Sequence, residues 1–216
     1  MPTPDWFSRT VLTELDRWVQ LSESQIDQLY RHYELLLHWN QRMNLTTVKP
    51  GPETVLRHYC ESLFFAAHLP AENDQTRVLD LGSGAGFPGI PMAVLKPRWH
   101  VTLVESHKRK AVFLRESSRD LANVSVISER FEDISQAADW AVARAVDPDA
   151  ILAAVQCLAP NIGLMLGEDD FSALRSDSRI AWAEPVRLPW GDRRICVFGS
   201  DVSHGTTRGT NDLCST

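Results

Sequence analysis

The chain has 216 residues and a hydrophobic content of 44%, which suits one globular domain with additional segments. Its net charge of −6 excludes a generally basic nucleic-acid binder, so any contact with nucleic acid must come from a local basic patch. The four scattered cysteines, the lack of a secretory signal and the lack of a membrane-length apolar run favour a cytoplasmic protein. Its thiols are expected to be reduced, without a zinc site or disulfide framework.

The first third of the chain predicts a helical layer over residues 1–73. Apolar residues recur at helical spacing within 9–20, which predicts a first helix. The capping-box pattern SESQ at 22–25 begins an apolar stripe that predicts a second helix over 23–40. A third helix is expected from Glu53 to about Leu69, and no side chain of the layer is assigned chemistry from its spacing.

A buried strand, a glycine loop and a helix follow one another in the run VLDLGSGAGFPGIPMAVL, residues 78–95. This succession opens a doubly wound α/β domain, whose glycines allow a sharp turn and the close approach of a ligand. From Gly84 the loop fits the G-x-G-x-x-G dinucleotide fingerprint. From Asp80 it fits the D-x-G-x-G-x-G loop of S-adenosylmethionine methyltransferases. The second interpretation is favoured, because Asp80 can meet the ammonium of a methionine moiety but would repel a pyrophosphate.

The following strand supports a nucleoside ligand. It ends on Glu105, about twenty residues after the glycines, where a carboxylate can accept hydrogen bonds from a ribose diol. A helix from Lys108 to about Leu121 is predicted next. The cations in its first turn oppose the helix dipole, so they are either a solvated charge run or a contact for RNA phosphates.

Later strands are predicted at 124–127 and 140–143. Acidic residues after the first of them would face an adenine, and Arg144 at the end of the second faces the ligand crevice or a buried ion pair. The remaining elements complete an alternating α/β pattern: helix 149–158, strand 162–166, helix 169–175 and strands near 180–188 and 193–199. The expected domains are therefore a helical extension over 1–73, an α/β domain over 74–199 and a flexible tail over 200–216.

The chain resembles the RsmG (GidB) family of bacterial 16S rRNA guanine-N7 methyltransferases from about Leu35 to Phe198. Three blocks carry the resemblance in the correct order: HWNQRMNLT, RHYCESL and the glycine loop with its continuation PGIP. The resemblance implies a class I methyltransferase fold, a Rossmann-like doubly wound sheet of seven strands with the last one antiparallel. It also implies S-adenosyl-L-methionine as cofactor and 16S rRNA or the small ribosomal subunit as partner. A monomer is the simplest expectation.

The same resemblance implies the functional residues. The expected cofactor contacts are Asp80, Gly82, Gly84, Gly86, Phe87, Glu105, Phe131, Glu132 and Arg144. A Lys-Arg pair that faces RNA in the family falls on Arg109 and Lys110, with Lys108 beside them. The implied target is the guanine at position 527, in the 530 loop. Methylation of N7 needs no general base, so Arg144 is assigned a positioning role, and Trp39 or Phe87 is expected to stack on a base. No metal is expected.

Two departures from the family keep an alternative open. The family usually has Lys-Gly after the fifth strand, whereas residues 165–170 read MLGEDD, and Val146 replaces an aromatic residue. An acidic cluster beside an RNA-facing crevice motivates a divergent member that binds the cofactor or RNA with a lost or altered target. An NAD-dependent oxidoreductase is the less favoured alternative, because of Asp80 and the absence of an obvious Tyr-x-x-x-Lys pair.

Overall fold

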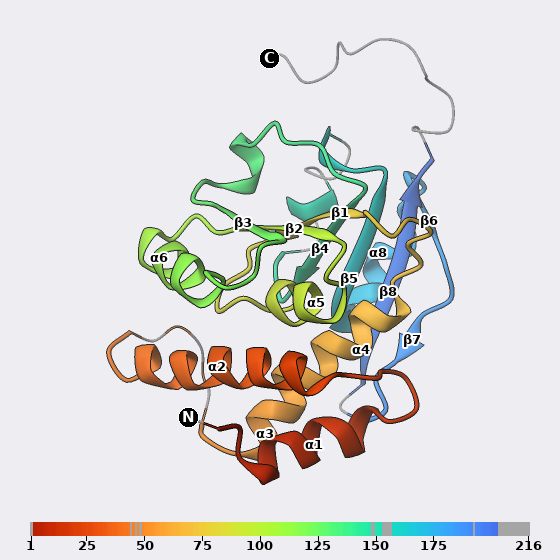
Figure 1. Cartoon of the computed structure of the whole chain (residues 1–216). Coiled ribbons are helices and arrows are strands. Elements are labelled where there is room, and N and C mark those ends of the chain that lie inside the picture. Colours follow the sequence, from red (N-terminus) through yellow and green to blue (C-terminus); the bar gives the residue numbers. More distant parts are fainter. Residues whose placement is uncertain are drawn as a thin grey trace.

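The computed structural model describes residues 2–202, except for residues 44, 46, 48, 148–149, 153–156 and 192. A mixed sheet of eight strands forms the centre of the described chain. Helices from α1 (Asp5–Leu15) to α6 (Lys108–Ser117) lie on one face of this sheet (Figure 1). The predicted fold class, a class I Rossmann-like doubly wound α/β sheet, is confirmed.

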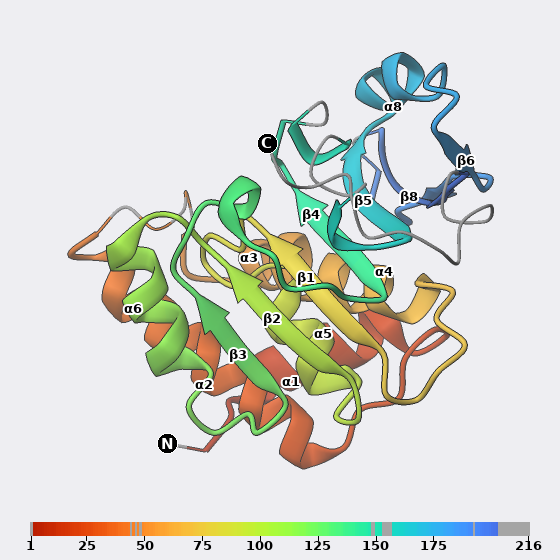
Figure 2. The same ribbon diagram turned by 90° about the horizontal axis from the view of Figure 1, so that it is seen from above.

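The sheet runs in the order β3-β2-β1-β4-β5-β8-β6, and β7 pairs with β8 beside this path. The strands are β1 (Arg77–Leu81), β2 (His100–Val104), β3 (Val124–Ile127), β4 (Trp140–Arg144), β5 (Asn161–Gly167), β6 (Ile180–Trp182), β7 (Val186–Arg187) and β8 (Arg194–Asp201). The first five are parallel, and β8 is antiparallel to β5, β6 and β7. β1 lies between β2 and β4 (Figure 2), so the order reverses there and opens a crevice at the carboxyl ends of these strands.

The predicted strand near 180–188 is two strands, so the sheet has eight strands where seven were expected. Pro185 separates β6 from β7, and a proline has no backbone N–H to donate to a strand ladder. The last strand, β8, continues to Asp201, two residues beyond the expected end of the α/β domain at residue 199. The predicted tail beyond Val202 lies outside the described residues.

Two helical layers cover the face of the sheet that carries the N-terminal extension. α4 (Glu61–His68), α5 (Gly89–Leu95) and α6 form the inner layer, and α2 (Glu23–Asn40) packs across α5 and α6. The predicted capping box is present at Ser22, whose hydroxyl accepts from the N–H of Gln25. The Gln25 amide donates to the carbonyl of Val94 at 2.7 Å, which fixes α2 against the end of α5.

Several helix boundaries differ from the predictions. The first helix is α1, because Phe7 continues the four-residue spacing of Val11 and Leu15 toward the N-terminus. The third is divided into α3 (Pro52–Thr54), a π-helical segment Val55–Cys60 and α4. α6 ends at Ser117, four residues early, and the predicted helix 149–158 lies partly outside the described residues.

On the opposite face, α8 (Glu168–Leu174) packs Phe171 and Leu174 against a second apolar cluster. Cys60 and Cys196 are free and buried. Among the described residues, no helix has the length and apolar character needed to cross a membrane, and no group of side chains could hold a metal.

Candidate functional site

The glycine loop leaves β1 at the point where the strand order reverses. Gly82, Gly84 and Gly86 have φ angles of +72°, +58° and +89°, which side chains with a Cβ rarely adopt. A Cβ at Gly82 would also lie 2.8 Å from Cγ2 of Val146. The N–H groups of Gly82 and Ser83 donate to the carbonyl of Val104 at 2.9 and 3.0 Å. The loop is therefore bent over the end of β2, and its backbone requires glycine.

Asp80 lies fully buried beneath this loop. Its Oδ2 accepts a hydrogen bond from the N–H of Gly89 at 2.9 Å, whereas its buried Oδ1 has no hydrogen-bond partner in the structure. Burial raises the pKa of Asp80 to about 7, although the bond from Gly89 favours the ionised form. An unsatisfied buried oxygen is costly in free energy, so Asp80 is suited to a cationic or hydrogen-bond-donating ligand group.

Glu105 closes the loop from the β2 side. Its Oε2 accepts from the N–H of Gly84 at 2.9 Å and its Oε1 accepts from the N–H of His107 at 2.8 Å. Only 7% of Glu105 is exposed. The structure thus brings Glu105 to the glycines, as expected, and each oxygen retains acceptor capacity for a diol. Ribose binding by Glu105 stays a prediction.

His32 of α2 anchors the loop from the helical layer, a role that sequence reasoning missed. Its Nε2 lies 3.0 Å from the carbonyl of Ala85, and its Nδ1 lies 2.7 Å from the hydroxyl of Tyr59. Since a carbonyl only accepts, Nε2 carries the proton and Nδ1 accepts from Tyr59. Burial lowers the pKa of His32 to about 4, so the ring stays neutral. The available signal was a histidine on the buried stripe of helix 23–40.

This neutral histidine makes stability sensitive to acid. Burial lowers the pKa of His32 to about 4, and burial followed by the charge of Arg144 lowers that of His58 to about 3. Between pH 6.5 and 4, the unfolded chain binds protons that the native state does not, so the free energy of unfolding falls. Each histidine should contribute a loss on the order of 3 kcal/mol. Urea unfolding across this range should show a shallower decline for His32→Gln, whereas His38→Gln, exposed on the same helix, should follow the wild type.

Phe87 and Trp39, the two candidates for base stacking, have different surroundings. Phe87 is 7% exposed and packs against the rings of His58 and Tyr59, with centroid distances of 4.9 and 5.0 Å. These neighbouring rings leave no open face of Phe87 on which a base could stack. A cofactor contact at Phe87 stays a prediction. Trp39 packs on Phe113 of α6 and lines a separate cavity of about 280 Å³, so the structure does not bring it to the glycine loop.

The expected adenine-binding residues form a short 3₁₀ turn, Phe131–Asp133. Phe131 and Glu132 line a small cavity of about 110 Å³ together with Gly82. Glu132 is exposed and pairs with Arg130 at 3.1 Å. The structure therefore places both residues next to the first glycine of the loop, on the side away from Arg144.

Arg144 is the last residue of β4. It forms a buried ion pair with Glu61, and it also lines the crevice. Its Nη2 donates to the carbonyl of Arg57 at 2.8 Å and lies 3.5 Å from Oε2 of Glu61. Its buried Nη1 has no hydrogen-bond partner. Glu61, 1% exposed at its side chain, also accepts from Arg194 of β8 at 2.7 Å. Burial raises the pKa of Glu61, although both arginines oppose the shift.

Glu61 and Arg194 were not assigned a role from the sequence. A signal existed for Glu61, because it begins the apolar run ESLFFAA, where a charge on a buried face needs a partner. Arg194 gave no comparable signal. Together with Arg144 they line a cavity of about 500 Å³ at the carboxyl ends of β4 and β5. Val146, which also lines this cavity, borders Gly82.

The acidic run that follows β5 is largely neutralised. Glu168 lies 2.9 Å from Arg187 and 3.5 Å from Arg193, and Asp169 lies 2.9 Å from Arg193. Both arginines come from β7 and the turn before β8, so the sequence order alone did not reveal the pairing. Asp170 is not part of these pairs and lines the 500 Å³ cavity.

The predicted RNA-binding run begins α6. Lys108 and Arg109 are exposed and Lys110 is half-buried. Because α6 follows β2, this run lies at the same edge of the sheet as Glu105 and the glycine loop. Contact with RNA at this run stays a prediction.

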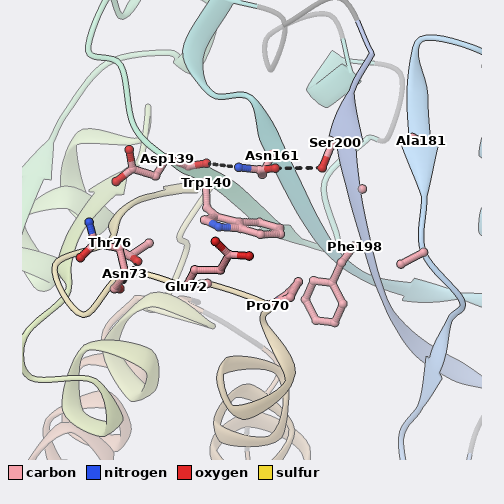
Figure 3. Close-up of a pocket in the computed structure, with 13 residues that line it drawn as sticks. Pro70, Glu72, Asn73, Thr76, Asp139, Trp140, Asn161, Ala181, Phe198 and Ser200 are labelled. Carbon is pink, nitrogen blue, oxygen red and sulfur yellow. Dashed lines mark hydrogen bonds between the residues drawn. The ribbon is translucent and has the colours of Figure 1, made fainter. Parts of the chain in front are cut away.

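A different cavity, of about 450 Å³, lies at the opposite edge of the sheet, where β4 and β5 begin. Figure 3 shows Trp140 and Phe198 in its wall, with Asn161 hydrogen-bonded at 2.9 Å to the carbonyl of Asp139 and to Ser200. None of the residues predicted to bind a cofactor or RNA lines this cavity. Ligands of open α/β sheets bind at the carboxyl ends of the strands, so the glycine-loop edge is the candidate site.

Comparison with known proteins identifies sequence relatives. The family described as GidB, rRNA small subunit methyltransferase G, matches residues 25–166. A protein named ribosomal RNA small subunit methyltransferase G from Lactococcus lactis is 37% identical over 152 residues, which cover 67% of this chain and 63% of the relative. Proteins of the same name from Leuconostoc citreum and Xanthomonas campestris are 34% and 36% identical. They align with 83% and 80% of this chain, and with 84% and 86% of their own lengths.

Solved structures support the fold. A SAM-dependent methyltransferase from Aquifex aeolicus gives a TM-score of 0.57 at 15% identity, covering 69% of this chain and 93% of that protein. Fibrillarin from Aeropyrum pernix, solved with natively bound S-adenosyl-L-methionine, gives a TM-score of 0.51 at 15% identity, covering 64% and 73%. At these identities the likeness concerns the fold alone.

Proposed function

The chain belongs to the GidB family, rRNA small subunit methyltransferase G, and on this premise we propose that it transfers a methyl group from S-adenosyl-L-methionine to ribosomal RNA. The acceptor is N7 of a guanine in 16S rRNA, the guanine at position 527 in the 530 loop. The substrate is 16S rRNA or the small ribosomal subunit.

The buried, unpartnered Oδ1 of Asp80 under a loop of positive-φ glycines is the observation that carries the cofactor assignment. Asp80 binds the ammonium of the methionine moiety, and the free Nη1 of Arg144 binds its carboxylate. Glu105 binds the ribose diol. Phe131 and Glu132 bind the adenine, in the small cavity beside Gly82. Each polar part of the cofactor thereby meets a group of opposite hydrogen-bonding character.

The chemistry requires alignment and no general base. When bound, the cofactor supplies a methyl group on a sulfonium, and guanine N7 has an in-plane lone pair and no proton to lose. The C–N7 bond forms as the C–S bond breaks, leaving a neutral thioether and a cationic guanine. Asp80 and Arg144 hold the donor in place, so their contribution is orientation of the reacting atoms. The exposed run Lys108, Arg109 and Lys110 contacts RNA phosphates at the same edge.

A methyl-transfer assay tests this proposal. Tritiated methyl groups should enter 16S rRNA in small subunits from a strain that lacks N7-methylguanine, and mass spectrometry should locate the mark at position 527. Fully methylated subunits serve as the control and should accept no label. Label on another base would contradict the target, and binding of S-adenosylmethionine without transfer would favour the divergent binder. Stabilisation by NAD in thermal unfolding, without stabilisation by S-adenosylmethionine, would favour the oxidoreductase.

The raised pKa of Asp80 predicts a pH-dependent affinity. With its pKa raised to about 7 by burial, Asp80 is partly protonated in the ligand-free protein, and its neutral form stabilises the fold. This contribution is lost as pH rises through 7, while the carboxylate that the ammonium requires becomes available. Calorimetry between pH 6 and 7.5 should therefore show affinity increasing with pH. Asp80→Asn, which can still accept from Gly89, should bind more weakly and lose the pH dependence that distinguishes the wild type.

A further inference from the structure

We propose that Asp170 recognises the acceptor guanine, by accepting hydrogen bonds from its Watson–Crick edge in the cavity beside Arg144. This inference rests on the proposed function and adds to it the residue that selects the base.

The cavity is suited to a base in size and lining. Its volume of about 500 Å³ lies within the range of small-molecule sites. Val146, Met165 and Leu188 supply apolar surface on which a planar ring can pack. Val146 also touches the position of the missing Cβ of Gly82, so this cavity borders the loop assigned to the methyl donor.

The polar groups of this cavity are largely engaged with one another. Glu61 and Arg194 form an ion pair, and Asp147 already has an interaction partner. Two groups remain available. The Nη1 atom of Arg144 has no hydrogen-bond partner, and its two N–H groups can donate both to the cofactor carboxylate and to one further acceptor. Asp170 lines the cavity with its side chain exposed, and it has no hydrogen bond or ion pair among the described residues. A ligand that offers an acceptor near Arg144 and donors near Asp170 would satisfy both.

The position of Asp170 is set by the end of β5. A Cβ at Gly167 would lie 3.3 Å from Oδ2 of Asp170, so the carboxylate lies over this glycine. Glu168 and Asp169, by contrast, pair with Arg187 and Arg193. The acidic run after β5 is thus divided between two neutralised carboxylates and one that faces the cavity.

Guanine matches this arrangement. Its N1–H and N2–H₂ groups are adjacent donors that one carboxylate can accept together, whereas adenine presents an acceptor at N1. Its O6 is an acceptor beside N7. Gly82 follows β1, Arg144 ends β4 and Gly167 ends β5, and these three strands are neighbours, so Arg144 lies between the glycine loop and the end of β5 that leads to Asp170. A guanine with N7 toward the loop therefore directs O6 to Arg144 and its Watson–Crick edge to Asp170.

A substitution at Asp170 tests the assignment. Asp170→Asn should lower kcat/KM for unmethylated small subunits by about 10-fold or more, because an amide cannot accept both guanine donors. Its affinity for S-adenosylmethionine should equal that of the wild type. Asp169→Asn is the matched control, since the neighbouring carboxylate is 83% exposed and pairs with Arg193. It should retain wild-type kcat/KM.

The acceptor base provides the second half of the test. Small subunits are reconstituted with 16S rRNA that carries guanosine or inosine at the methylated position, since inosine lacks the 2-amino group. The wild type should prefer guanosine by about 10-fold, and Asp170→Asn should show little preference. An unchanged preference in Asp170→Asn, or wild-type activity of this variant, would overturn the inference. Failure of the wild type to methylate the guanosine subunits would instead overturn the proposed function.

Discussion

Replacing Gly82 by aspartate should abolish binding of S-adenosylmethionine. Gly82 has a φ of +72°, and an added Cβ would meet Cγ2 of Val146 at 2.8 Å. The aspartate would also add a negative charge to a loop that already lies over the carboxyl group of Asp80 and is bonded to the carboxylate of Glu105 through the N–H of Gly84. Isothermal titration calorimetry should show at least a 100-fold loss of affinity, about 3 kcal/mol of binding free energy.

A glycine elsewhere separates local strain from damage to the site. Gly191 also has a positive φ, +83°, but a Cβ there has no neighbour within 4 Å. Gly191→Asp should therefore carry a similar backbone strain of about 1 kcal/mol and retain cofactor affinity. If both variants bound S-adenosylmethionine as tightly as the wild type, the glycine loop would not be the cofactor site.

Replacing Glu61 by alanine should produce the largest loss of stability. This carboxylate is 1% exposed at its side chain, and two arginines, Arg144 and Arg194, converge on it. Removing it leaves two guanidinium groups in a poorly solvated crevice without their counter-charge. The expected cost is about 4 kcal/mol, which would lower the melting temperature by about 10 °C. Differential scanning calorimetry would measure the change.

An exposed ion pair on the preceding turn is the control for Glu61. Glu53 and Arg57 lie 3.4 Å apart with side chains 83% and 48% exposed, so Glu53→Ala should cost less than about 0.5 kcal/mol. Adding Arg194→Met to Glu61→Met should recover part of the lost stability, because one uncompensated charge is removed. Equal losses for Glu53→Ala and Glu61→Ala would show that the charges around Glu61 are solvated.

Features encoded by neighbouring residues could be predicted from the sequence. The glycine loop requires a strand before it and a helix after it, and Ser22 and Gln25 define the start of α2 within four residues. Because such signals are local, the order of strands and helices was recoverable. The division of the strand at Pro185 was missed, although its cause is local too.

Contacts between distant segments account for most of what could not be predicted. His32 reaches the carbonyl of Ala85, 53 positions later, and Arg194 reaches Glu61 across 133 positions. No periodicity records such a pairing. The acidic run at 168–170 suggested repulsion of RNA, and only the folded chain reveals that Arg187 and Arg193 neutralise most of it.

The distance in sequence between Glu61 and Arg194 also bears on how the protein is made. During translation the carboxylate emerges from the ribosome long before the strand that carries its partner, so a growing chain has the glycine loop but an incomplete crevice. The crevice at the ends of β4 and β5 is therefore complete only once β8, which carries Arg194, has been synthesised.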